Sequence, residues 1–235
     1  MTFSVIAHCP KTGKFGFVST TSTPGVGGRC GDVAPGFGVV AVQALADARQ
    51  LRAARQHLES GLTAQEVLDQ LEKDDEYFDF RQIAIVDVQG GIAVRTGSRA
   101  KAWKGEVVGP NFVALGNMIV GERVVKAMAE TYAANESRVF EDRLLTAIEA
   151  GRDAGGQANG QTSAALLVYD NRYGFPTVNL RVDVDAEPVG KLRTIFDWFQ
   201  PLIPYYVERT LDPASVVLSR DEFMTQRGLR VNPFR

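Results

Sequence analysis

The sequence has little histidine and little cysteine, with two residues of each type among 235. Transition-metal sites in proteins draw most of their ligands from these residue types, so we expect no bound metal. His8 and His57 lie far apart in the sequence, and Cys9 and Cys30 match neither a metal-binding motif nor a disulfide framework. We therefore expect two reduced thiols, a cytoplasmic protein and no cofactor.

A basic charge excess and long apolar runs are also missing. The net charge is −2, the pI is about 5.8, and the aromatic residues, 9% of the chain, are not interleaved with basic patches. We therefore expect no nucleic acid as a partner. The apolar runs are shorter than the ~20 residues of a membrane-spanning helix, and no secretory signal pattern opens the chain, so we expect no membrane partner. A small-molecule substrate is the partner that these absences leave.

Common catalytic and nucleotide-binding motifs do not occur either. The sequence lacks a Walker A motif and the G-x-S-x-G motif of a nucleophile elbow. The stretch TPGVGGRCGDVAPGFG is rich in glycine, but it does not have the G-x-G-x-x-G form between a strand and a helix. We interpret it as a loop. Acidic residues follow several predicted strands, where they usually end the strand in water and only rarely bind a hard cation.

What is present is the composition of a soluble globular domain, with 45% hydrophobic and 23% charged residues. Alternating or continuous apolar runs predict strands, and periodic segments predict helices. The predicted strands cover residues 2–8, 15–21, 36–44, 81–88, 92–96, 111–118, 162–170 and 177–183. The predicted helices cover 47–59, 63–72, 121–134, 137–151 and a segment from Pro188, and the segment 97–109 reads as a loop. Thr63 and Glu66 form a capping-box pattern at the start of the second helix.

The order of these elements predicts the fold class. Strands, two helices, strands, two helices and strands follow one another, which favours an α+β fold in the form of a four-layer αββα sandwich. Two antiparallel sheets would then be flanked by pairs of helices, with a generic α+β fold as the alternative. We predict one domain over residues 1–200 and a C-terminal extension over 201–235, which contains several prolines.

Thr2, directly after the initiator Met1, is the candidate nucleophile. A hydroxyl is a weak nucleophile unless a base takes its proton. Removal of Met1 would give Thr2 a free α-amine, whose intrinsic pKa of ~7.7–8.0 leaves part of it neutral near pH 7. Nucleophile and base would then belong to one residue, which is a known variant of the catalytic triad. An ordinary strand threonine is the alternative, and Cys9 is a weaker candidate nucleophile.

Several stretches together resemble one family, the uncharacterised DUF1028 proteins. The resemblance runs through TFSVIAHCPKTGKFGF, VVAVQA, RQIAIVDVQGGIAVRTGSRAKAWKGEVVGPNFVALGNMIVG, AGGQANGQTSAALLV and VNLRVDVDAEPVGKLRTIF. It covers residues 2–200 in order and leaves the last 35 residues as an addition. It implies the N-terminal nucleophile hydrolase sandwich and an amide-bond hydrolase whose processed threonine attacks a carbonyl, acting on a small amide or ureide-like substrate.

We expect the following roles around Thr2. Ser4 and His8 share a strand face with Thr2, because side chains alternate with period two; Ser4 would orient the amine and His8 would contact substrate. Asn117 would help to stabilise the oxyanion together with a backbone N–H. The remaining predicted substrate-binding residues stand at strand ends or loop edges and are Gln43, Gln161 and Ser163.

The sequence also departs from the family pattern at five positions. These are Ala100, Gln157, Asn159, Val184 and Asp185, where the family pattern resembles Cys, Asp, Arg, Asp and His. Such changes indicate an altered pocket or a catalytically silent binding or assembly protein, which is the alternative function. In that case Trp198, Phe199, Tyr205 and Tyr206 would supply aromatic anchors for a partner. We expect a homo-oligomer.

Overall fold

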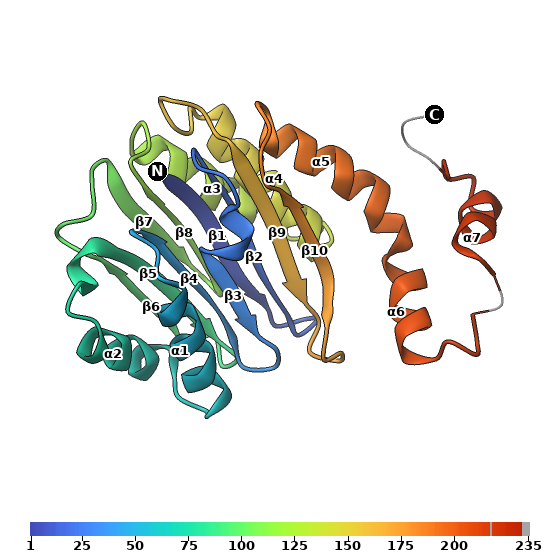
Figure 1. The fold of residues 1–235 in the computed structure, drawn as a ribbon, viewed down its shortest axis with the longest axis horizontal. Coiled ribbons are helices and arrows are strands. Elements are labelled where there is room, and N and C mark those ends of the chain that lie inside the picture. Colours follow the sequence, from blue (N-terminus) through green and yellow to red (C-terminus); the bar gives the residue numbers. More distant parts are fainter. Residues whose placement is uncertain (217, 232–235) are drawn as a thin grey trace. The chain divides into compact units, whose positions relative to one another are not determined.

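The computed structural model describes residues 1–216 and 218–231. It contains two antiparallel sheets (Figure 1). The larger sheet has the order β10-β9-β2-β1-β8-β7 and the smaller one the order β3-β4-β5-β6. The strands are β1 Thr2–Cys9, β2 Lys14–Thr21, β3 Gly31–Ala34, β4 Gly38–Ala44, β5 Arg81–Asp87, β6 Ile92–Thr96, β7 Lys104–Gly109, β8 Phe112–Asn117, β9 Ser163–Tyr169 and β10 Pro176–Val182.

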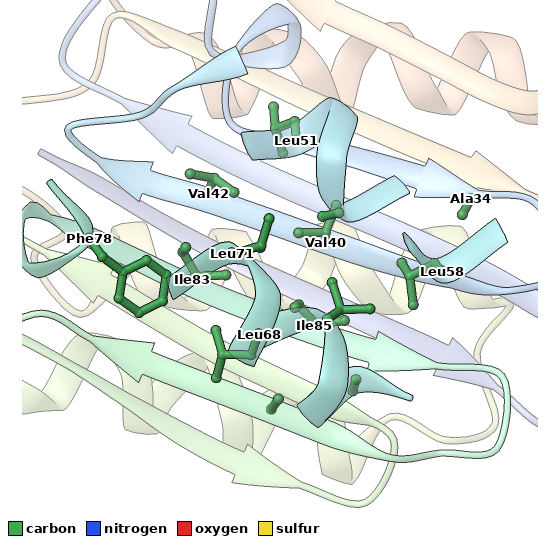
Figure 2. Close-up of a cluster of buried hydrophobic side chains, with 14 residues drawn as sticks. Ala34, Val40, Val42, Leu51, Leu58, Leu68, Leu71, Phe78, Ile83 and Ile85 are labelled. Carbon is green, nitrogen blue, oxygen red and sulfur yellow. The ribbon is translucent and has the colours of Figure 1, made fainter. Parts of the chain in front are cut away.

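Helices cover the outer face of each sheet. Helices α1 (Ala48–Glu59) and α2 (Ala64–Asp74) pack on the smaller sheet, and α3 (Glu122–Ala134) and α4 (Phe140–Asp153) pack on the larger one. Figure 2 shows the cluster of buried apolar side chains between α1, α2 and the smaller sheet, which includes Leu51, Leu71 and Ile83. The predicted four-layer αββα sandwich with two antiparallel sheets is confirmed.

A second buried cluster fills the space between the two sheets over most of their length. Alternation along each strand sends every second side chain into this layer and the others toward the helices. We call the part of the layer that holds apolar residues the apolar end. Its buried members are Ile6, Phe15, Phe17, Val26, Cys30, Val33, Val39, Ala41, Ala84, Val86, Val113, Leu115 and Ala165. Gly31 faces Phe17 so closely that a Cβ there would lie 2.4 Å from the ring, which explains the glycine.

The predicted helices are confirmed, with small shifts at their ends. Thr63 caps α2 as expected, because its hydroxyl accepts from the Glu66 backbone N–H while the Glu66 side chain accepts from the Thr63 backbone N–H at 2.8 Å. The fourth helix begins at Phe140, three residues later than the predicted residue 137.

Two strands were missed, and the loop predictions at those places were wrong. β3 lies inside the glycine-rich stretch, and β7 lies inside the segment 97–109. Both are edge strands of their sheets. β7 carries two glycines and half-exposed side chains, so its sequence shows no buried apolar face. Short edge strands of this kind give a weak local signal, because pairing with a neighbour stabilises them more than their own composition does.

The contacts divide the chain into two units, Met1–Leu192 and Arg193–Arg235. Helix α5 (Pro188–Phe199) crosses this boundary, followed by α6 (Ile203–Leu211) and α7 (Arg220–Gln226). The C-terminal unit has a small apolar cluster of its own, in which Leu202, Tyr205, Phe223 and Met224 are buried. The predicted boundary at residue 200 stays a prediction. Within the described residues, no helix combines the length and apolar character needed to cross a bilayer.

Candidate functional site

Thr2 opens β1, one of the two central strands of the larger sheet. β1 lies between β2 and β8, where Thr2 pairs with Thr21 on one side and with Asn117 on the other. Its side chain is 4% exposed, and its Oγ1 lies 3.1 Å from Oγ1 of Thr21. The hydroxyl of Thr2 is therefore directed toward β2, at one end of the layer between the sheets.

Met1 covers Thr2. The Thr21 hydroxyl donates a hydrogen bond to the Met1 carbonyl oxygen, and the Met1 amine lies 3.8 Å from Sδ of Met118. Since the Thr21 proton is engaged in this way, the Thr2 hydroxyl donates to Thr21. Burial lowers the pKa of the Met1 amine, with Cys30 opposing this and Lys101 adding to it. Removal of Met1 would thus leave the α-amine of Thr2 at the end of β1, between its neighbours β2 and β8.

The residues below Thr2 in the inter-sheet layer are polar and uncharged. Each strand that contributes to this part brings one or two of them, and we call the group the polar end. Its members are Thr2, Ser4, Ser19, Thr21, Gln43, Gln82 and Asn117, all between 0% and 4% exposed. Buried polar groups cost free energy unless they are hydrogen-bonded, so such a group needs internal partners.

A continuous set of hydrogen bonds supplies these partners. The Ser4 hydroxyl donates to Oε1 of Gln43 at 2.7 Å and lies 2.8 Å from Oγ of Ser19. Nε2 of Gln43 donates to Oε1 of Gln82 at 2.7 Å, and Nδ2 of Asn117 donates to the same oxygen at 3.2 Å. Because Ser4 and Asn117 lie in the larger sheet and Gln43 and Gln82 in the smaller one, the network joins the two sheets.

Some buried polar atoms at this end of the molecule have no partner within the described chain. Oδ1 of Asn117 is one, and Oγ of Ser22, next to Thr21, is another. Both polar atoms of the Gln157 side chain are also buried without a hydrogen bond. Gln157 belongs to the loop between α4 and β9, whose Gly156 carbonyl accepts from Val120 N–H. These atoms are donors and acceptors whose hydrogen-bonding capacity the described chain does not use.

Ser163 and Gln161 belong to the same side of the molecule. Ser163 Oγ donates to the Thr23 carbonyl at 2.7 Å and accepts from the Val26 N–H at 3.0 Å. This hydroxyl therefore fastens the glycine-rich loop to β9. Gln161 is half-buried, and its Nε2 lies 2.5 Å from where a Cβ on Gly156 would be. Its substrate-binding role stays a prediction.

His8 lies at the opposite end of β1 from Thr2. Its ring stacks on Phe15 at 4.3 Å between centroids, and its Nδ1 is buried without a partner. Burial lowers the pKa of His8, and Asp87 partly opposes this. Three residue pairs of β1 and β2 separate His8 from Ser4, and five separate it from Thr2, so the structure does not bring His8 together with the nucleophile. Cys9 follows His8 and is one residue further from Thr2 along β1.

A cavity of about 470 Å³ lies away from the polar end and from His8. It opens at the edge between the two sheets, where Asp32, Arg52, Arg55, Tyr169 and Arg181 line it. Arg55 and Arg181 are paired with Asp32 and with Asp183, at 3.7 and 2.8 Å. No predicted site residue lines this cavity. In residues 1–216 and 218–231, no group of three or more His, Cys, Asp or Glu side chains is placed to hold a metal ion.

Comparison with known proteins identifies the family. The model of DUF1028, described as a family of unknown function, matches residues 2–192. The chain belongs to the DUF1028 family. A crystal structure of the DUF1028 protein SPO2555 from Silicibacter pomeroyi is similar at 32% identity and a TM-score of 0.78, covering 85% of this chain and 86% of that chain. A search of curated proteins finds no match.

Two Anbu proteins are also similar in structure. Anbu from Hyphomicrobium sp. strain MC1 matches at 13% identity and a TM-score of 0.44, over 93% of this chain and 99% of that chain. Anbu (ancestral beta-subunit) from Yersinia bercovieri matches at 10% identity and a TM-score of 0.42, over 88% of this chain and 97% of that chain.

The positions that depart from the DUF1028 pattern differ in burial. Gln157 is buried, while Asn159 and Val184 are exposed. Ala100 is buried in a turn with Gly97, and the Asp185 carboxylate accepts from the Glu187 N–H at 2.8 Å. Gln157 is therefore the departure that places an unpaired polar side chain in the interior.

Sequence reasoning missed three members of the polar end, namely Ser19, Thr21 and Gln82. A signal for them exists, because each stands at the inward-facing position of an otherwise apolar strand, at the same end as Ser4 or Gln43. It could not be read locally, since the registers of β1 with β2 and of β4 with β5 decide which strand ends meet.

Proposed function

We propose that this DUF1028 protein is an N-terminal-nucleophile amidohydrolase that cleaves a small amide or ureide-like substrate. The observation that carries the proposal is the position of Thr2 at the head of a central strand, above a buried group of uncharged polar side chains. A purely structural strand end has no need for seven buried polar residues, because each of them requires a hydrogen-bond partner to offset its desolvation.

The chemistry follows from Thr2 once Met1 is removed. The α-amine takes the proton of the Thr2 hydroxyl while Oγ1 attacks the substrate carbonyl carbon, and the carbonyl oxygen gains the negative charge. Collapse of this intermediate breaks the C–N bond, and the α-ammonium gives its proton to the leaving nitrogen. Water then hydrolyses the ester on Oγ1, with the amine as base again, and regenerates Thr2.

The composition of the polar end supports a neutral substrate. Its buried side chains are amides and hydroxyls, which match the donors and acceptors of an amide or ureide. Gln157, with its donor and acceptor unpaired, lies on the loop whose Thr162 N–H donates to the Thr21 carbonyl at 2.7 Å. We assign substrate recognition to this loop.

Two measurements test the proposal. The intact mass of protein made in the cytosol should lack Met1, and quantitative retention of Met1 would contradict the mechanism. The Met1-free protein should hydrolyse members of an amide and ureide library, and Thr2→Ala should lower that rate by at least ~10³-fold, as expected for loss of a nucleophile. Thr2→Ser, which keeps the hydroxyl, is the matched control and should retain measurable activity. A Thr2→Ala variant as active as the parent would rule out Thr2.

The alternative of a catalytically silent assembly protein has less support. Tyr205, one of its proposed anchors, is 5% exposed and packs against Phe223 within the C-terminal unit. Trp198 is half-buried and donates to the Arg230 carbonyl at 3.2 Å. The homo-oligomeric state and the cytoplasmic location stay predictions.

A further inference from the structure

Three acceptors around Gln82 determine which groups donate and which accept in the hydrogen bonds of the polar end. The two Nε2 protons of Gln82 are shared among three acceptors, the carbonyl oxygens of Gly116 and Gly105 at 3.0 and 3.2 Å and Oγ1 of Thr96 at 2.9 Å. Main-chain carbonyls only accept. The Thr96 hydroxyl donates its proton to the Glu106 carboxylate at 2.6 Å, so the Thr96 oxygen accepts from Gln82. The amide of Gln82 therefore has one permitted orientation.

This orientation fixes the side chains next to Gln82. Since Nε2 of Gln82 points at the carbonyls, its Oε1 points at Gln43 and Asn117, and both must donate to it. Gln43 then has only Oε1 left for Ser4, which must donate. Asn117 keeps its second Nδ2 proton and its Oδ1, and Oδ1 is buried and has no partner in the described chain.

Asn117, the residue that carries this oxygen, lies next to Thr2 in the sheet. The two residues are direct cross-strand partners, and Cβ atoms of such pairs are ~4.5–5.5 Å apart. The Thr2 hydroxyl is directed to the other neighbouring strand, toward Thr21. The Met1 amine lies against Met118, the residue after Asn117. The chain that leaves Thr2 toward the N-terminus thus runs along the Asn117 side.

We propose that Asn117 is the hydrogen-bond acceptor for the α-amine of Thr2, and that Gln82 is the positioning residue that turns its Oδ1 toward that amine. The inference rests on the proposed function, in which Met1 is removed. It adds to the role predicted for Asn117, because Oδ1 accepts from the amine while the second Nδ2 proton, the one that Gln82 does not bind, remains able to donate to an oxyanion.

An acceptor beside the amine has a measurable effect. A carbonyl oxygen that binds the ammonium form stabilises it and raises the pKa of the amine. Loss of Asn117 Oδ1 should therefore lower this pKa by about one unit, given the usual strength of a hydrogen bond to a charged group. Gln82→Met removes the oxygen that holds Asn117 Nδ2, frees the amide to rotate, and should lower the same pKa.

The test measures the amine directly, without a substrate. The full chain is made behind a leader protein that a protease removes immediately before Thr2, with ¹³C-labelled threonine. The Thr2 Cα and Cβ chemical shifts are then followed by NMR from pH 5 to pH 10. We expect Asn117→Leu and Gln82→Met each to lower the pKa of the amine, and the double variant to show no further decrease, since Gln82 acts through Asn117.

Thr20→Val is the matched control. Thr20 is fully buried on the helix-facing side of β2 and donates to the Ser163 carbonyl at 2.8 Å. Its loss should lower stability without changing the pKa of Thr2. An unchanged pKa in Gln82→Met and Asn117→Leu, or additive decreases in the double variant, would overturn the inference. If the pKa changes as expected but the protein hydrolyses no amide, the proposed function fails and the positioning of the amine stands.

Discussion

The two ends of the inter-sheet layer use the same strands in different ways. β1 places Ile6 in the apolar end and Ser4 in the polar end, and β2 likewise places Phe17 and Ser19. All four side chains are fully buried, so burial does not distinguish the ends. The apolar end holds the sheets together by packing, which does not depend on the direction of any hydrogen bond. The polar end holds them through hydrogen bonds whose donors and acceptors must match, and it therefore orients its side chains as well as packing them.

The largest expected effect on stability comes from the apolar end. Phe17→Ala should lower the free energy of unfolding by ~3–5 kcal/mol, because it removes a fully buried ring and leaves a cavity beside Gly31. Denaturant titration measures this loss. Phe17→Leu, which refills most of the space, is the control and should lose clearly less. Equal losses of free energy in both variants would contradict the prediction that filling this space stabilises the fold.

A smaller effect is expected when the polar end is broken. Ser4→Ala leaves Oε1 of Gln43 buried without a donor and should lower the free energy of unfolding by ~1–3 kcal/mol. Ser19→Ala is the matched control, because Ser4 can still donate to Gln43 and the loss should be smaller. If Ser19→Ala costs as much as Ser4→Ala in the same titration, the direction assigned to the network is wrong.

The smallest effect concerns pH at the far end of β1. Burial lowers the pKa of His8 in the folded state, so the unfolded chain binds the proton more readily. Stability should therefore fall as the pH decreases through the unfolded value of ~6.5, with a slope no steeper than ~1.4 kcal/mol per pH unit. His8→Phe keeps a ring that can stack on Phe15 and removes the titration. Unfolding curves at pH 7 and pH 5 should then show less acid sensitivity in the variant, and equal sensitivity would exclude His8 as its source.

Local sequence patterns predicted most of the fold but only part of the site. The capping box at Thr63 and the apolar strands carry their signal within a few residues, and the order of the elements then limits the architecture. β3 and β7 escaped because edge strands depend on a neighbour for their pairing. In the site, the structure brings Thr2, Ser4, Gln43 and Asn117 together at one end of the layer, while their predicted roles stay predictions.

The remainder of the site depends on pairings between distant segments. Gln82 reads as an ordinary residue near the start of an apolar strand until β5 is set beside β4 and opposite β8. Ser163 and His8 make contacts that their strands alone do not predict. Ser163 binds the glycine-rich loop, and His8 stacks on Phe15. The role of a polar side chain thus follows from register and from the neighbour's donor or acceptor, which a single strand does not encode.

The pairing of Thr2 with Asn117 also has a consequence for the timing of biosynthesis. In the folded chain, Thr21 binds the Met1 carbonyl and Thr2 is almost fully buried, so an aminopeptidase has little access to the Met1–Thr2 bond. β1 acquires β2 early, but β8 is synthesised more than a hundred residues later. At ~5–20 residues per second, the ribosome takes on the order of ten seconds to deliver it. In the proposed mechanism, removal of Met1 would therefore compete with folding, and the late arrival of β8 would leave the Met1–Thr2 bond accessible to an aminopeptidase in the meantime.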